Sequence, residues 1–218
     1  HYRLPQYVFY VDDARRLTKG AGFDAAAALR AKGKFCNFVV SNPRCPQRNR
    51  FFRKLNRRKR VDSGGRHFNN LGQPIADKLA FVRDYKFTLA FENSASDGYT
   101  TEKLVEPMLA GSLPIYWGNP LVGLDFNPRS FIDVSAFPDF DAAIDHILKV
   151  DADDELYLSY LREPWFNGDT PPSWFDEGEH LAAWRRFLGT PWVERPRIYR
   201  DRGLRDHALG TGLGRHLS

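Results

Sequence analysis

Hydrophobic and polar positions follow two patterns along this chain, one typical of strands and one typical of helices. Short apolar runs cover residues 34–41, 86–91 and 113–117, and turn-forming or polar residues bound each run, as expected of buried parallel strands. After the run at 86–91, a polar loop leads into a helical segment that Thr100 or Thr101 can cap. The strand, loop and helix layout occurs twice, and it predicts a Rossmann-like α/β domain with a mainly parallel sheet.

Weaker signals complete the predicted architecture. Further strands are expected at 61–63 and 131–134, and helices at 23–32, 74–83, 140–150, 154–161 and 174–188. We therefore divide the chain into an N-terminal segment with a helix (1–33), a Rossmann-like domain (34–150), helices that pack on it (151–190) and a basic tail (191–218).

The run at 86–91 ends abruptly in Glu92 and Asn93, which indicates a strand that meets a polar crevice. Glu102 and Lys103 fall in the first turn of the next helix, whose free N–H groups and dipole favour phosphate. Lys103 adds a full charge, whereas Glu102 repels phosphate but can accept hydrogen bonds from ribose or sugar hydroxyls. In the alternative interpretation, Glu102 only complements the helix dipole and Lys103 is a solvated charge.

Arg48 occupies the matching place in the first unit, at the start of a helix that begins near Gln47. Its guanidinium could bind a diphosphate bidentately, or it could be one charge of a solvated basic face. The segment 44–60 holds nine basic residues and no acidic one, within a net charge of +5. This concentration predicts an anionic partner: a nucleotide-sugar diphosphate, a membrane surface or nucleic acid. Nucleic acid is disfavoured because few aromatic residues interleave with the charges.

Several motifs, in order and spacing, resemble the α-1,3/1,4-fucosyltransferases of glycosyltransferase family 10, including bacterial members. The resemblance is strongest over residues 34–150. The motifs are Phe38-Val39-Val40-Ser41-Asn42-Pro43, Arg48-Asn49, Gly64-Gly65, Asn69-Asn70-Leu71-Gly72, Tyr85-Lys86-Phe87, Phe91-Glu92-Asn93, Gly98-Tyr99, Thr101-Glu102-Lys103, Pro114-Ile115-Tyr116-Trp117-Gly118, Asp125-Phe126-Asn127-Pro128 and Ser130-Phe131.

The resemblance implies that this chain is the C-terminal, donor-binding half of a two-domain GT-B enzyme. Such an enzyme transfers L-fucose from GDP-β-L-fucose to an N-acetylglucosamine-containing glycan, in α-1,3/1,4 linkage and with inversion. Arg48 and Lys103 are then expected to neutralise the departing GDP, and Glu102 to hold hydroxyls or stabilise a cationic sugar. Asn93 and Tyr99 would complete the donor pocket. The general base is expected from the acceptor domain, outside this chain.

Other chemistry has weaker support. The pair Asp12-Asp13 suggests a divalent metal, but acidic residues at a helix start are ordinary and the family resembled is metal-independent, so no metal or cofactor is expected. Cys36 and Cys45 are too few for a disulfide framework. Gly64-Gly65 and Asn69-Asn70 form a polar loop whose backbone could approach a base or sugar closely, or which is an ordinary surface loop.

We expect a bacterial protein of the cytoplasm, without a signal peptide or a membrane-spanning run, that contacts the inner membrane through its basic tail. Its acceptor could belong to lipopolysaccharide or to a protein glycan. Two other functions stay open, namely transfer from another nucleotide sugar and a non-catalytic module that binds anions or nucleic acid.

Overall fold

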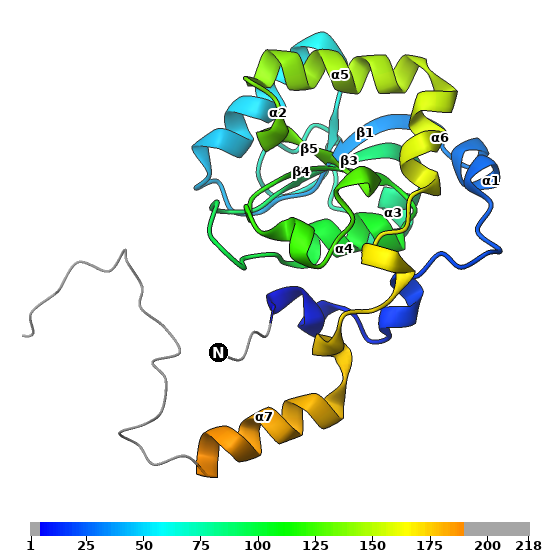
Figure 1. The fold of residues 1–218 in the computed structure, drawn as a ribbon. Coiled ribbons are helices and arrows are strands. Elements are labelled where there is room, and N and C mark those ends of the chain that lie inside the picture. Colours follow the sequence, from blue (N-terminus) through cyan, green and yellow to red (C-terminus); the bar gives the residue numbers. More distant parts are fainter. Residues whose placement is uncertain (1–4, 190–218) are drawn as a thin grey trace, which may run out of the picture.

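The computed structural model describes residues 5–189, and its centre is a five-stranded sheet in which every pair of neighbours is parallel (Figure 1). The strand order is β2-β1-β3-β4-β5. The strands are β1 (Lys34–Phe38), β2 (Asp62–Ser63), β3 (Tyr85–Phe91), β4 (Leu113–Trp117) and β5 (Ile132–Asp133). The predicted Rossmann-like α/β class is therefore confirmed.

Helices cover both faces of the sheet. Figure 1 shows α2 and α5 on one face and α3 and α4 on the other, while α6 lies against α1 and α5. The helices are α1 (Ala25–Arg30), α2 (Pro46–Arg58), α3 (Lys78–Arg83), α4 (Glu102–Leu109), α5 (Phe140–Ala152), α6 (Asp154–Arg162) and α7 (Glu177–Gly189). Short 3₁₀ segments are η1 (Gln6–Tyr10), η2 (Ala14–Leu17), η3 (Val122–Leu124), η4 (Pro128–Ser130), η5 (Val134–Ala136), η6 (Asn167–Asp169) and η7 (Ser173–Phe175).

The core is built around β3, the central strand. Its side chains Phe87, Ala90 and Phe91 are buried, as a strand covered on both faces requires. Phe91 contacts Phe51 of α2, with ring centroids 4.8 Å apart, and stacks on Trp117 at the end of β4. The packing of β3 therefore fixes the position at which its carboxyl end leaves the sheet.

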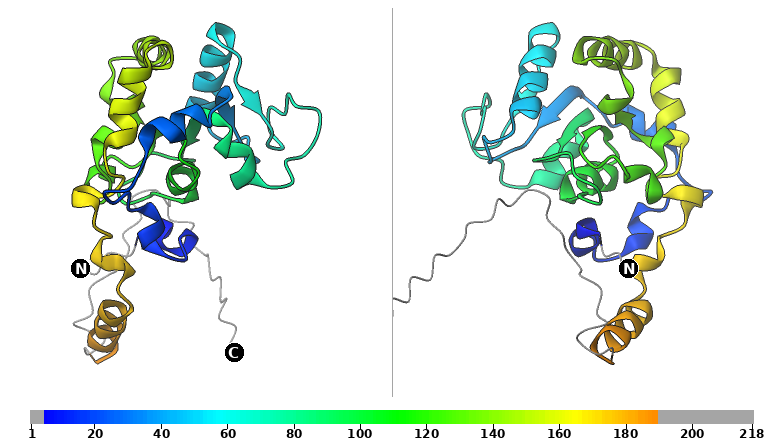
Figure 2. Two further views of the ribbon diagram at one scale, coloured as in Figure 1. Left: turned by 90° about the vertical axis from the view of Figure 1, so that its right-hand side faces the viewer. Right: turned by 60° about the vertical axis from the view of Figure 1, so that its left-hand side comes forward.

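The N-terminal segment joins the same core. Tyr7 of η1 and Leu17 of η2 are fully buried, and both 3₁₀ segments pack against α4. The Tyr7 ring meets Phe126 edge-on at 4.8 Å. In contrast, α7 extends away from the sheet and its helices (Figure 2). The basic tail predicted at 191–218 lies outside the described residues.

Differences from the predicted elements are local and have identifiable causes. The predicted strand at 34–41 ends at Phe38, because the Val40 carbonyl accepts the His67 N–H at 3.0 Å from a loop instead of pairing within the sheet. The predicted helix at 74–83 begins only at Lys78, because Asp77 caps it by accepting the Ala80 N–H at 3.0 Å.

Candidate functional site

Open α/β sheets form a crevice where the strand order reverses, and in this sheet that place is between β1 and β3. From β1 the chain passes through α2 to β2, and from β3 it passes through α4 to β4, on the opposite side. The strand order therefore reverses between β1 and β3. Open α/β sheets bind ligands at such a switch point, outside the carboxyl ends of the strands.

Arg48 spans this switch point from the first turn of α2. Its side chain is only 1% exposed. Nη1 donates to Asn93 Oδ1 at 2.9 Å, beyond the end of β3, and Nη2 donates to the Asn42 carbonyl, beyond the end of β1. Nε is buried and has no partner. The interpretation of Arg48 as a solvated surface charge is therefore wrong, and the predicted pair Arg48 and Asn93 is brought together.

Burial lowers the pKa of Arg48, against the attraction of Cys45, Glu92 and Tyr99. An arginine whose ordinary pKa exceeds 12 keeps its proton despite that shift. The start of α2 also lacks a side-chain cap: Cys45 occupies the N-cap position and its thiol faces the Glu92 carbonyl at 3.5 Å. A buried permanent cation and an uncapped helix terminus thus lie together, and both favour an anion.

Several side chains form hydrogen bonds at the start of α4. Thr101 is the N-cap residue, so the predicted helix start is confirmed, and its Oγ1 accepts the Lys103 N–H at 3.4 Å. Glu92 is fully buried; it accepts the Thr101 N–H through Oε1 and the Thr101 hydroxyl through Oε2, both at 2.8 Å. Asn119 adds a further tie, since its side chain donates to Thr100 Oγ1 at 3.0 Å and accepts the Gly98 N–H at 2.8 Å.

Lys103 lies between two carboxylates. Its Nζ is 3.0 Å from Glu102 Oε1, 3.4 Å from Glu92 Oε2 and 3.0 Å from Thr101 Oγ1. Burial acts to lower the pKa of Lys103, but the attraction of Glu92 and Glu102 outweighs it and raises that pKa. Burial likewise acts to raise the pKa of Glu102, and the neighbouring Lys103 brings it below its usual value. Both groups are thus charged at neutral pH, and Lys103 is not a freely solvated charge.

Glu92 lies in the middle of this region but was not among the predicted site residues. Burial raises its pKa, and Lys103 and Thr101 oppose that shift. The signal was present, because Glu92 interrupts an apolar strand and belongs to the motif Phe91-Glu92-Asn93. A carboxylate at that place has to find partners inside the protein.

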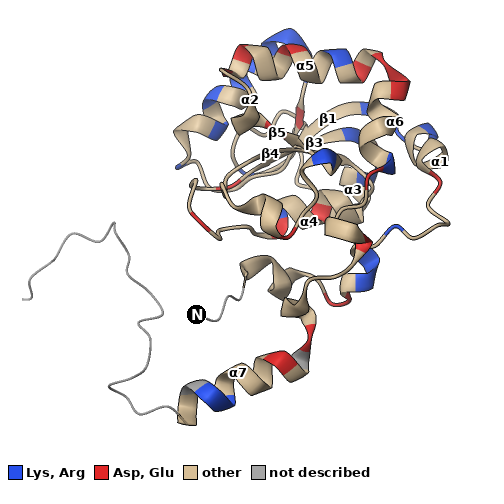
Figure 3. Ribbon diagram, in the orientation of Figure 1, with Lys and Arg blue, Asp and Glu red and all other residues tan. Residues whose placement is uncertain are grey.

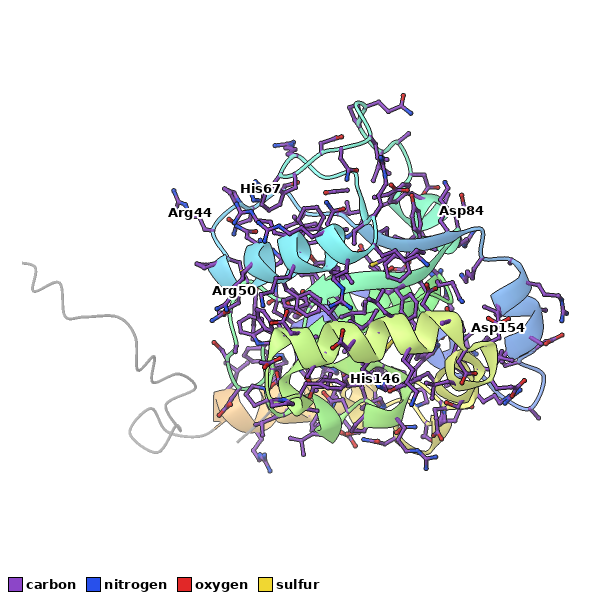
Figure 4. The ribbon with its side chains drawn as sticks, turned by 90° about the horizontal axis from the view of Figure 1, so that it is seen from above. Arg44, Arg50, His67, Asp84, His146 and Asp154 are labelled. Carbon is purple, nitrogen blue, oxygen red and sulfur yellow. The ribbon has the colours of Figure 1, made fainter. Side chains whose placement is uncertain are left out.

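Tyr99 lies on the loop between β3 and α4. Its N–H donates to the Ser96 carbonyl at 3.1 Å, and it lies near enough to Arg48 and Lys103 to interact electrostatically with both. Arg44, Arg50 and His67 lie near the beginning of α2 (Figure 4). The predicted donor-pocket residues therefore come from the first turns of α2 and α4 and from the loop after β3.

The two neighbouring glycines have a packing role in the fold, and their predicted approach to a base or sugar stays a prediction. A Cβ at Gly65 would lie 2.0 Å from the Val40 carbonyl oxygen, and one at Gly64 would lie 2.2 Å from Ile75 Cδ1. Both glycines therefore allow close packing within the protein, since a side chain at either position would overlap its neighbour. Asn70 also has a structural role, since its side chain donates to the Val61 carbonyl at 2.9 Å.

The basic run at 44–60 is partly neutralised within the fold. Lys54 pairs with Asp141 at 2.6 Å and Arg58 with Asp145 at 2.9 Å, so two ion pairs four residues apart join α2 to α5. Figure 3 marks the basic positions along α2 and the acidic positions along α5. Lys59 pairs with Asp151. Arg60 also pairs with Asp62 at 2.9 Å, so ion pairs within the fold account for four of the nine basic residues and leave the others to face the predicted anionic partner.

In the pair Asp12-Asp13, the second residue has an ordinary capping role at the start of η2. Asp13 accepts the Arg15 N–H at 3.0 Å at the start of η2, and its carboxylate also pairs with the Arg15 guanidinium at 2.8 Å. Over residues 5–189 the structure contains no group of three or more His, Cys, Asp or Glu residues arranged to hold a metal ion. Within the same residues, no helix is both long enough and apolar enough to cross a membrane.

A Rossmann-like domain with a buried arginine and a half-buried lysine beside its switch point has the features with which open α/β sheets bind phosphate-bearing ligands. Residues 29–170 match the family described as glycosyltransferase family 10 (fucosyltransferase), C-terminal part. The chain therefore belongs to the family 10 glycosyltransferases, as the sequence motifs predicted.

Known relatives share most of this chain. It is 39% identical over 170 residues to an α-(1,3)-fucosyltransferase of Helicobacter pylori, covering 78% of this chain and 35% of the relative. It is 35% identical over 177 residues to mouse GDP-fucose protein O-fucosyltransferase 3, covering 74% of this chain and 37% of the relative. The chain thus spans about a third of the length of these curated relatives.

Solved structures give the same result. A crystal structure of an α-1,3-fucosyltransferase with GDP-fucose matches with a TM-score of 0.68 at 36% identity, over 77% of this chain and 51% of that chain. One with GDP matches with a TM-score of 0.70 at 38% identity, over 73% of this chain and 48% of that chain. These similarities cover about half of each solved chain.

Proposed function

We propose that this chain is the donor-binding part of an enzyme that transfers L-fucose from GDP-β-L-fucose to an acceptor hydroxyl. The observation that carries the proposal is Arg48, a buried cation at the switch point whose Nε has no partner. Lys103 supplies a second cation in the same crevice. Structural relatives that were solved with GDP-fucose and with GDP support a guanosine diphosphate in this place.

In the proposed reaction, an acceptor oxygen attacks C1 of fucose on the face opposite the diphosphate. The bond between C1 and the diphosphate oxygen breaks, and its electron pair leaves with GDP. This displacement converts the β-linked donor into an α-linked product, so the configuration inverts. Arg48 and Lys103 stabilise the negative charge that grows on the departing diphosphate.

Glu102 has the opposite electrostatic role in this scheme. Its carboxylate is ionised, because the pKa remains below its usual value beside Lys103, despite burial. A carboxylate repels phosphate but accepts hydrogen bonds from ribose or fucose hydroxyls and favours a sugar carrying positive charge. Asn93 and Tyr99 complete the donor pocket from the loop that follows β3.

The proposed acceptor is a hydroxyl of an N-acetylglucosamine-containing glycan, with α-1,3 or α-1,4 linkage, in an enzyme of GT-B architecture. The proton of that hydroxyl passes to a general base. We assign the base to the other half of the enzyme, because Glu92 and Glu102 are both engaged with Lys103. A protein hydroxyl is a second candidate acceptor, favoured by the similarity to GDP-fucose protein O-fucosyltransferase 3.

The test of donor class is calorimetry of this chain with GDP, ADP and UDP, at low and high salt, with and without EDTA. We expect GDP to bind most tightly, with little effect of EDTA. Equal affinity for the three nucleotides would contradict the assignment to GDP-fucose, and tightest binding of UDP or ADP would favour another nucleotide sugar. Binding that ignores the base and weakens steeply with salt would indicate a non-catalytic polyanion-binding module.

A further inference from the structure

Glu92 is a carboxylate that the fold buries completely. It follows the last residue of β3, its backbone N–H donates to the Trp117 carbonyl at 2.9 Å, and its side chain is 0% exposed. Removing a carboxylate from water is costly unless hydrogen bonds and an opposite charge compensate. The position of Glu92 therefore requires specific partners.

All of these partners belong to the first turn of α4. The Glu92 carboxylate accepts the backbone N–H and the hydroxyl of Thr101, and its Oε2 lies 3.4 Å from Lys103 Nζ. A single side chain thus connects the end of the central strand to the helix cap and to the ammonium beside it. None of these contacts is with a residue on the surface side of the loop.

A glycine independently shows that the fold makes room for this side chain. A Cβ at Gly118 would lie 2.5 Å from Glu92 Cγ and 2.8 Å from Glu92 Cβ, distances that real side chains do not adopt. The Tyr116 hydroxyl would be 3.0 Å away and accepts the Asn119 N–H on the same loop. The chain after β4 is therefore shaped around Glu92.

From this geometry we propose that Glu92 is a positioning residue for donor binding: it holds the first turn of α4 so that Lys103 faces the diphosphate. The inference rests on the proposed function, because it concerns the same crevice. Glu92 acts through Lys103 and Thr101 and does not itself touch the donor.

Lys103 needs such a support for two physical reasons. A lysine has a flexible four-carbon stem, so an unsupported ammonium samples many positions. Glu102, with Oε1 3.0 Å from Lys103 Nζ, would otherwise draw the ammonium toward itself. An ammonium has three N–H donors, so Lys103 can keep its contact with Glu92 while another N–H turns to a phosphate oxygen.

The decisive test is the affinity of this chain for GDP after Glu92→Gln. Removing a negative charge close to an anion site should strengthen GDP binding if Glu92 acts only as a charge. The positioning role predicts the opposite sign, a loss of about tenfold, because Lys103 is no longer held by an opposite charge. GDP affinity that is unchanged or higher in Glu92→Gln would overturn the proposal.

A double-mutant cycle with Lys103→Met separates positioning from general damage. If Glu92 acts through Lys103, Glu92→Gln should cause no further loss of GDP affinity in the Lys103→Met background. The same loss in both backgrounds would overturn the proposal and leave Glu92 a merely structural residue. Thermal unfolding of each variant checks that the proteins compared are folded.

A second variant keeps the test available if Glu92→Gln does not fold. Thr101→Val removes the hydroxyl that contacts both Glu92 and Lys103 and leaves the charges in place, whereas Thr101→Ser retains that hydroxyl. We expect Thr101→Val to lose GDP affinity several-fold and Thr101→Ser to bind like the wild type; equal affinity of the two would overturn the proposal. Wild-type protein that fails to bind GDP would instead contradict the proposed function.

Discussion

The two strand, loop and helix units of the crevice prepare their helix starts in opposite ways. At α2 the N-cap residue Cys45 makes no side-chain cap, and Arg48 keeps a buried Nε without a partner. At α4 the cap Thr101 is in place, and Lys103 already contacts Glu92 and Glu102. The start of α2 therefore has hydrogen-bond donors left for an anion. At the start of α4, the side chains already bond one another within the protein.

This difference indicates a division of labour within one site. Arg48 is held by Asn93 and by the Asn42 carbonyl, and its buried Nε has no partner. Lys103 has to share its ammonium between carboxylates and phosphate. A bound diphosphate should therefore gain more from Arg48 than from Lys103.

The largest effect on GDP affinity should come from replacing Arg48 at the start of α2. Arg48→Met should weaken GDP binding by about 3 kcal/mol, since it removes a buried, hydrogen-bonded charge. Arg48→Lys should recover only part of this affinity, because an ammonium lacks the bidentate geometry of a guanidinium. Calorimetry with GDP measures both values.

Arg57→Met is the matched control, because it removes the same charge from the last turn of the same helix, where the side chain is exposed. This variant should bind GDP like the wild type. Similar losses in Arg48→Met and Arg57→Met would mean that net charge governs affinity, and the assigned role of Arg48 would be wrong.

The sequence predicted the strands and helices around this site better than the contacts between their side chains. The apolar runs that became β3 and β4 are long, and Thr101 and Gly111 mark the ends of α4 by local chemistry, so each could be found from neighbouring residues. The resemblance to family 10 then supplied Arg48, Asn93, Tyr99, Glu102 and Lys103 as site residues.

What the sequence did not show were contacts between distant segments. Lys54 and Asp141 lie 87 positions apart, and nothing local indicates that α5 would neutralise part of the basic run. Gly65 packs closely against the backbone of Val40, and the sequence alone does not show that contact. Glu92 reads as the edge of a crevice, yet its carboxylate turns inward to Thr101.

The next largest effect concerns Glu102 at the start of α4, and it separates GDP binding from fucose transfer. Glu102→Gln should change the GDP affinity of this chain by less than about 1 kcal/mol, because Glu102 repels phosphate but still neutralises part of Lys103. In the complete enzyme the same change should slow fucose transfer about 100-fold, since it removes a charge that stabilises a cationic sugar. Calorimetry and a transfer assay test the two halves, and normal transfer would reduce Glu102 to a helix-dipole residue.

A smaller effect concerns the stability of the α4 side. Gly118→Ala should lower the free energy of unfolding by about 1–3 kcal/mol, because the new methyl group would overlap Glu92. Gly22→Ala is the control, since a Cβ there meets no atom within 4 Å. Chemical denaturation measures both. Equal stability of the two variants would show that the chain around Glu92 yields easily, against the rigid support inferred for Lys103.

The smallest expected effect is an absence of pH dependence, and it sharpens the account of Lys103. Burial acts to lower the pKa of Lys103, but Glu92 and Glu102 outweigh it, so the pKa lies above the ordinary 10.5. A base with a raised pKa stays protonated below that value, and GDP affinity should therefore be flat from pH 7 to pH 9. His67 does not titrate in this window, because burial and the neighbouring Arg48 and Arg53 lower its pKa from 6.5.

Glu92→Gln should introduce a pH dependence where the wild type has none. Without the Glu92 charge, burial is opposed mainly by Glu102, so the pKa of Lys103 falls and GDP affinity should decline toward pH 9. The terminal phosphate of GDP, with a second pKa near 6, is already about 90% ionised at pH 7, so it contributes little change of its own. Calorimetry at pH 7, 8 and 9 compares the two proteins. Parallel profiles would show that Glu92 does not control the charge state of Lys103.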